Sequence, residues 1–177
     1  MRYFNWLFAA LASTTSAYGA ALEMKEIQYR GGIINFSVPK NWVEESEPDG
    51  GAMFYEDAPD TGTLRLNVIT ATSPQLLSDD AAFERLAAMS SVAAGSVQRL
   101  KNGNAIATSI LRSTEQGHAI TLFWWYVTNP VRPNHMRIAN FSYTVLTEKE
   151  GSETVKRDVQ LLTEAIKNSR FHPTLGE

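Results

Sequence analysis

The sequence contains no cysteine, which excludes a disulfide framework, a thiolate nucleophile and a lipid attached through a cysteine. Stability must therefore come from a packed core, and a chain of 177 residues is long enough to form one. No long apolar run occurs after the first dozen residues, so we expect no membrane span in the rest of the chain. Histidine is scarce as well. His118, His135 and His172 are far apart, and this spacing disfavours a histidine-based metal site.

The motifs of the common catalytic classes are also missing. The chain has no Gly-x-Ser-x-Gly elbow, no His-Glu-x-x-His helix, no phosphate-binding Gly-rich loop and no dinucleotide fingerprint. We therefore predict that the protein is not an enzyme and carries no cofactor. A hydrolase whose site leaves no recognisable motif stays open as an alternative.

The N-terminal segment has the composition of an export signal. Met1 and Arg2 supply a positive start, residues 3–11 form a short apolar run, and residues 12–21 are mostly small. The apolar run is too short for a membrane-spanning helix, which needs about 20 apolar residues. A helix or strand of the mature fold is the alternative interpretation of this segment.

We predict a signal peptide over residues 1–19, cleaved after Gly19 or after Ala21, and a single domain over residues 20–177. The mature protein is then expected to be periplasmic or secreted, without a membrane span.

Acidic residues are concentrated in one segment of the chain. Residues 44–80 contain nine carboxylates and a single cation, Arg65, and most other basic residues come later. Loss of Arg2 with the signal peptide would move the formal net charge from −3 to about −4. No basic stripe interleaved with aromatics occurs, so we expect no nucleic-acid partner. The acidic segment is either a solvated loop region or a face that attracts a basic protein.

Six carboxylates of this segment are the candidate partner-binding residues: Glu44, Glu45, Glu47, Glu56, Asp57 and Asp60. Residues 56–60 also offer several hard oxygen atoms to a cation such as calcium. Their spacing is not that of an EF-hand loop, however, and acidic turns often occur without calcium. We therefore predict no metal site and assign the six carboxylates to a protein interface.

The apolar pattern predicts a chain rich in short strands. The expected strands cover residues 26–29, 33–38, 53–56, 64–68, 97–100, 104–114, 118–127 and 136–146. Gly31-Gly32, Asn102-Gly103 and Gln116-Gly117 fall between successive strands, where hairpin turns need residues that tolerate positive φ.

Residues 122–127 read Leu-Phe-Trp-Trp-Tyr-Val and are apolar on both alternating faces, so this strand should lie inside a sheet. Trp124 and Trp125 point to opposite faces, and at least one should be in the core. Residues 129–134 contain two prolines, and we expect a connection without strand pairing there. Trp42 follows a proline turn and is predicted to be a core residue; an exposed binding anchor is the alternative.

Two helices are expected. Ser78 is a favourable N-cap for the first, whose apolar residues include Phe83 and Leu86 and whose end is expected near Gly95. The second, over about residues 148–169, has a single apolar stripe formed by Val155, Val159, Leu162 and Ile166.

The start of the second helix has two candidate caps. Thr147 with Glu150 matches a capping box, while Ser152 is a rival cap. Strands followed by helices in this order indicate an α+β domain, in which helices pack an antiparallel sheet.

The layout resembles a known family. Residues 36–42 read Phe-Ser-Val-Pro-Lys-Asn-Trp, a strand that ends in a Pro-x-x-Trp turn. The Trp-rich strand is followed by residues 137–145, Arg-Ile-Ala-Asn-Phe-Ser-Tyr-Thr-Val, and then by a helix that ends near Ser169-Arg170-Phe171. Over roughly residues 27–171 this pattern resembles Mog1/PsbP-like domains. The resemblance implies a single domain with a curved antiparallel β-sheet packed by helices, an α/β/α sandwich.

The resemblance implies a binding role and transfers no catalytic residues. The family includes factors that bind a small GTPase, extrinsic photosystem subunits, secretion-effector adaptors and periplasmic proteins that neutralise secreted toxins. Together with the export signal, this favours a non-enzymatic periplasmic protein, and we expect an immunity protein that occludes a basic-faced secreted toxin or wall-degrading enzyme. The alternative is an envelope accessory protein that binds a lipid or small apolar ligand between helix and sheet, in a cavity lined by Trp124 or Trp125.

Overall fold

A computed structural model describes residues 22–89, 91–93 and 95–174 of the chain. The elements in chain order are β1 (Met24–Tyr29), η1 (Arg30–Gly32), β2 (Ile34–Pro39), β3 (Val43–Ser46), β4 (Ala52–Tyr55), β5 (Thr63–Thr72), α1 (Ala81–Ala87), β6 (Gln98–Arg99), β7 (Ala105–Glu115), β8 (His118–Val131), β9 (His135–Leu146), η2 (Thr147–Lys149), α2 (Glu153–Lys167) and β10 (Arg170–Phe171). The predicted signal peptide, residues 1–19, lies outside the described residues. Among the helices that are described, none is long and apolar enough to cross a membrane.

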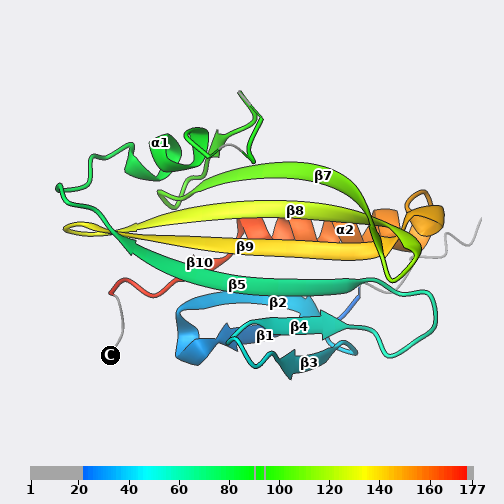
Figure 1. Ribbon diagram of the computed structural model, residues 1–177. Helices are drawn as coiled ribbons and strands as arrows, with labels where there is room; N and C mark the ends of the chain where they lie inside the picture. The colour runs from blue at the N-terminus through cyan, green and yellow to red at the C-terminus, as the bar shows by residue number, and fades with distance from the viewer. Residues whose placement is uncertain (1–21, 90, 94, 175–177) are drawn as a thin grey trace, which may run out of the picture.

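The strands form two antiparallel sheets (Figure 1). The larger sheet has the strand order β3-β4-β5-β9-β8-β7-β6, and the smaller has the order β1-β2-β10. The long strands β5, β9, β8 and β7 pair along most of their length. β8 carries the Trp-rich segment and lies between β9 and β7, which confirms its predicted place inside the sheet.

Side chains that alternate along the strands build two cores on opposite faces of the larger sheet. On β9, Ala139 and Phe141 belong to the main core, which also includes residues of β1, β2 and α2. Met136 and Ile138 face the other way and belong to a smaller cluster that α1 covers. In Figure 1, α2 lies behind β8 and β9, and α1 lies beside one end of β7. The α+β class and the helix–sheet–helix layering are therefore confirmed.

Both tryptophan predictions are confirmed. Trp42 is buried in the main core, and so is Trp125, whose neighbour Trp124 points to the opposite face and is only half-buried. Full burial of a large apolar side chain contributes about 1.5–3 kcal/mol, so these residues anchor the sheet.

One prediction about the prolines is wrong. β8 does not end before residues 129–134 but continues to Val131, and Pro130 pairs with Met136 of β9. The reason lies on the other side of the strand, where pairing with β7 ends opposite Thr128. Among the described residues, β8 has a neighbouring strand on one side only at Pro130, and a proline is tolerated where its missing N–H would face away from the ladder.

The helices are shorter than expected. α2 begins at Glu153 because Ser152 is the N-cap, with the Val155 N–H donating to Ser152 Oγ over 3.2 Å. The capping box with Glu150 does not form, since Glu150 instead binds Arg112 from the β7–β8 hairpin. α1 ends at Ala87, well before Gly95, and Ser78 bonds the Glu84 carboxylate and does not cap the helix.

Candidate functional site

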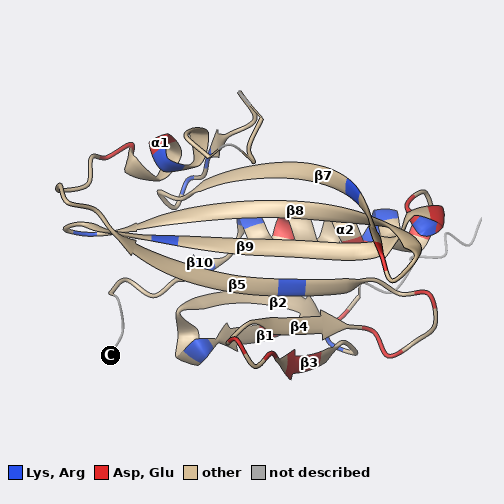
Figure 2. Ribbon diagram, in the orientation of Figure 1, with Lys and Arg blue, Asp and Glu red and all other residues tan. Residues whose placement is uncertain are grey.

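The six predicted partner-binding carboxylates lie at one end of the strand order, on β3 and on the connections before and after β4. We term this region, formed by Glu44, Glu45, Glu47, Glu56, Asp57 and Asp60, the acidic edge. β3 is the outermost strand and pairs only with β4 within the described part of the chain. Figure 2 shows acidic residues along β3 and on the connection between β4 and β5.

A tyrosine links two parts of the acidic edge. Glu44 and Glu45 are exposed and point to opposite faces of β3, and Glu45 Oε1 accepts a 2.6 Å hydrogen bond from the Tyr55 hydroxyl. This hydrogen bond is the main cause that raises the pKa of Tyr55, and burial and the charges of Glu45 and Asp57 raise it further. Because the charges of both carboxylates act on one phenol, β3 and the β4–β5 connection contribute to the same negative field.

Besides Glu45, three of the six carboxylates are held by neighbours. Glu47 Oε1 lies 3.4 Å from Arg65 Nε, and Glu56 Oε1 accepts a 3.0 Å bond from Asn41 Nδ2. Asp60 Oδ2 lies 3.0 Å from Lys149 Nζ, and this hydrogen bond raises the pKa of Lys149. These contacts partly neutralise the acidic edge and fix its outline.

Glu44 and Asp57 differ from the other four. Both are exposed, and neither side chain makes a hydrogen bond or an ion pair with any described residue. Their charges therefore face solvent without a partner. This makes them the two groups of the acidic edge most available to a cation on another molecule.

The acidic edge rests on a packed base. Thr61 Oγ1 donates to the carbonyl oxygens of Glu56 and Ala58, 2.8 and 2.9 Å away, and closes the connection on itself. The next residue, Gly62, lies so close to Tyr143 that a Cβ there would overlap the phenol ring. The loop therefore reaches the core only because residue 62 has no side chain.

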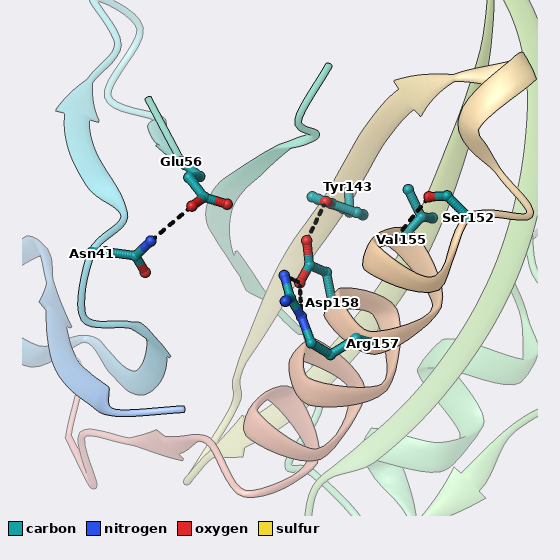
Figure 3. A network of polar contacts seen from close by, with 7 residues as sticks. All are labelled: Asn41, Glu56, Tyr143, Ser152, Val155, Arg157 and Asp158. Carbon is teal, nitrogen blue, oxygen red and sulfur yellow. Dashed lines mark hydrogen bonds and ion pairs between the residues drawn. The ribbon is translucent and has the colours of Figure 1, made fainter. Parts of the chain in front are cut away.

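Tyr143 joins this base to α2 (Figure 3). Its ring stacks on Trp42 with centroids 6.0 Å apart, and its hydroxyl donates to Asp158 Oδ2 over 3.0 Å. Asp158 is buried and is also bound by Arg157, whose Nη2 lies 2.8 Å from Asp158 Oδ1. Burial raises the pKa of Tyr143, and the charge of Asp158 raises it further. A buried carboxylate with these partners is satisfied, so the network acts as a rigid support.

A second feature is an apolar groove between α2 and the β7–β8 hairpin. It has a volume of about 440 Å³, and its lining includes Ile110, Phe123, Trp125, Val159 and Thr163. The indole N–H of Trp125 donates to Thr163 Oγ1 over 3.1 Å, which satisfies the polar end of this floor residue. The volume falls within the range of small-molecule sites, about 300–1,000 Å³.

The carboxylates are predictable from the sequence, but the side chains that bind some of them and leave others unpaired are not. Asn41, Tyr55 and Lys149 act on the acidic edge, and only the alternation of side chains along a β4 strand could have pointed to Tyr55. Among the described residues, no cluster of three or more His, Asp or Glu side chains is arranged to hold a metal ion.

No protein-family model matches the chain, and no curated protein matches its sequence. Its fold does match solved structures. A Bacteroides thetaiotaomicron protein aligns at 19% identity and a TM-score of 0.57, over 86% of this chain and 50% of that chain. The present chain therefore spans about half the length of that protein.

Two smaller proteins align over nearly their whole length. LpqN, which is involved in cell envelope biogenesis of Mycobacterium tuberculosis, matches at 12% identity and a TM-score of 0.56, over 86% of this chain and 92% of LpqN. The Saccharomyces cerevisiae Ran-binding protein Mog1p matches at 11% identity and a TM-score of 0.52, over 85% of this chain and 96% of Mog1p. The chain has the Mog1/PsbP-like fold.

Proposed function

We propose that this protein is an exported, non-enzymatic binding domain whose acidic edge docks on a basic face of another protein. The observation that carries the proposal is the pair of exposed carboxylates, Glu44 and Asp57, which have no cationic partner within the described residues and rest on a rigid base. Charges placed in this way steer a basic partner toward the surface and raise the association rate.

The proposed location is the periplasm or the extracellular space, with residues 1–19 as the signal peptide. Two proteins of the same fold support different parts of this proposal: Mog1p is a Ran-binding protein, which supports a binding role, and LpqN is involved in cell envelope biogenesis, which supports the location. The finer proposal is an immunity protein that occludes a secreted toxin or a wall-degrading enzyme. Such an enzyme needs a basic cleft to approach anionic wall polymers, and a basic cleft is complementary to the acidic edge.

Affinity capture from the cell envelope fraction of the source organism tests this function. The immobilised protein is expected to retain a basic secreted enzyme or toxin at low salt and to release it at high salt. The double variant Glu44→Lys/Asp57→Lys should lose it. The control variant Glu84→Lys/Glu164→Lys, which changes the net charge equally on α1 and α2, should retain it. Identical capture by the two variants would refute the acidic edge as the interface.

The apolar groove favours a second candidate function, an envelope accessory protein that binds a lipid or small apolar ligand. Oleate serves as the probe, and quenching of tryptophan fluorescence is the readout, because Trp125 forms part of the floor. Ile110→Glu places a charge at the groove and should weaken quenching, whereas Ile69→Glu, at a similarly exposed position on β5, should not. Equal quenching in both variants would exclude the groove as the ligand site.

A further inference from the structure

The long strand β7 is an open edge of the larger sheet. β6 pairs with it only at Ala105 and Ile106, so among the described residues no strand lies beside residues 107–115 on that side. Unpaired N–H and C=O groups of an edge strand form a template that another extended backbone can complete. A proline, an inward-pointing charge or a covering helix would block this. Residues 108–111 have none of these, while Ala107, at the start of the open edge, is buried in the cluster that α1 covers.

The middle of this edge is apolar. Ile110 and Leu111 are 58% and 54% exposed and point to opposite faces of the sheet. They are two of the few large apolar side chains that are strongly exposed in the described chain, and they are adjacent. Of the charged residues on the open edge, Arg112 is already paired with Glu150, which leaves only Glu115 at the end of the strand. The edge therefore fits an uncharged strand.

The sequence of the edge fits a second copy of itself. Leu111 is the midpoint of residues 107–115, so a two-fold axis through Leu111 pairs the whole open edge with itself in antiparallel register. Ser109 then faces Ser113, and Thr108 faces Thr114, which are favourable cross-strand pairs. Arg112 faces Ile110, so no like charges are opposed. The axis also keeps the copy clear of Ala105 and Ile106, which β6 occupies.

We propose that two copies of the chain associate through β7, antiparallel and centred on Leu111, and extend the two larger sheets into one continuous sheet. The interface is isologous, as in most homodimers, because each edge supplies the same residues to the other. It lies at the opposite end of the strand order from the acidic edge, so each copy keeps its acidic edge free. The proposal goes beyond the proposed function and does not depend on it.

Sedimentation velocity from micromolar to millimolar concentration tests the association. The wild-type protein is expected to dimerise, and Leu111→Lys should raise the dimer dissociation constant by about tenfold or more, because two lysines would face each other across the axis. Ile69→Lys is the matched control, since Ile69 is 51% exposed on an interior strand and should leave the dimer unchanged. A monomer throughout this range, or a dimer that Leu111→Lys leaves intact, overturns the proposal.

The absence of cysteine makes the register directly testable. Directly opposed residues of antiparallel strands have Cα atoms about 4.5–5.5 Å apart, which a disulfide can bridge. Under mild oxidation with copper–phenanthroline, Leu111→Cys should therefore give a covalent dimer. Ser109→Cys should stay monomeric on a denaturing gel, because residue 109 faces residue 113 of the copy. Cross-linking of Ser109→Cys as fast as Leu111→Cys overturns the register and the proposed interface.

Discussion

The two edges of the larger sheet are built in opposite ways. β3 is short, carries Glu44 and Glu45, and is fixed to the core through Trp42 and Tyr143. β7 is long, is apolar at its midpoint, pairs with β8 along its whole length, and is also linked by the ion pair between Arg112 and Glu150 to the segment before α2. In Figure 2 acidic residues follow β3, whereas β7 shows little charge.

The difference matches the two kinds of association that we propose for this sheet. Glutamates on a short edge strand oppose the addition of another strand, so β3 is suited to contacts made by side-chain charge. A long edge with few charges offers its backbone, so β7 is suited to strand pairing. The following variants either loosen one edge while leaving the other intact or alter the charge of the acidic edge.

Gly62→Ala should loosen the acidic edge most strongly. The added methyl group overlaps the Tyr143 ring, and overpacking of this kind lowers the free energy of unfolding by about 3 kcal/mol. Urea unfolding measures this loss, and hydrogen exchange should become faster at β3 and β4 but not at β7. Gly151→Ala is the control, because nothing lies within 4 Å of a Cβ there. Equal stability of the two variants would contradict the close packing at Gly62.

Tyr143→Phe should have a smaller effect that depends on pH. At about pH 7 the variant loses the hydrogen bond to buried Asp158, which lowers the free energy of unfolding by about 1.5 kcal/mol. Burial raises the pKa of Tyr143 in the folded state, so above about pH 10 the unfolded chain loses this proton first. The folded state then binds more protons, and wild-type stability falls by about 1.4 kcal/mol per pH unit from this group.

The stability gap between wild type and Tyr143→Phe should therefore narrow as the pH rises above about 10 and should close at about pH 11. Urea unfolding of both proteins at several pH values measures this gap. Because the other tyrosines titrate in both proteins, their contributions cancel in the difference at each pH. A gap that stays constant over this range would show that Tyr143 keeps its ordinary pKa.

Arg112→Ala should loosen the other edge. Arg112 Nη2 lies 2.7 Å from Glu150 Oε1, and its hydrogen bond is the main cause that lowers the pKa of Glu150. Without it, amide hydrogen exchange in the β7–β8 hairpin should become several-fold faster, while exchange at β3 and β4 stays unchanged. Arg85→Ala, an exposed arginine on α1, is the control. A change that spreads equally to β3 would mean that the two edges are not independent.

Lys149→Ala should have the smallest effect and should strengthen the acidic edge. It releases Asp60 from its ion pair and adds one unpaired carboxylate. The association rate constant with the captured basic partner should rise by about twofold at low salt. Lys156→Ala is the control. It changes the net charge equally, but Lys156 pairs with Glu153 on α2, away from the acidic edge, so this variant should have less effect on the association rate constant. Equal rates for both variants would mean that only net charge matters.

Most of the fold followed from sequence patterns. The two-residue alternation found the long strands, and the stripe from Val155 to Ile166 found α2. β3 was missed because its sequence, Val-Glu-Glu-Ser, has almost no apolar pattern, as expected of an exposed edge strand. The extension of β8 through Pro130 was missed because it depends on where β7 ends, which local sequence does not encode.

The carboxylates of the candidate site were predictable, but their individual states were not. Asp60 and Lys149 are 89 residues apart in sequence, and Tyr143 reaches Asp158 through the packing of α2 on the sheet. Which charges stay free is decided by such tertiary contacts. The open edge of β7 could not be predicted from the sequence either, because a strand is an edge strand only if no other strand pairs with it in the folded chain.

The central claim is that Glu44 and Asp57 steer a basic partner, and its most direct test is the salt dependence of association. Stopped-flow measurement with the captured partner gives the association rate constant of wild type and of Glu44→Lys/Asp57→Lys at low and at high ionic strength. We expect wild type to associate about tenfold faster at about 20 mM salt and the two rates to converge at about 500 mM. Equal rates at low salt, or a difference that persists at high salt, would contradict the claim.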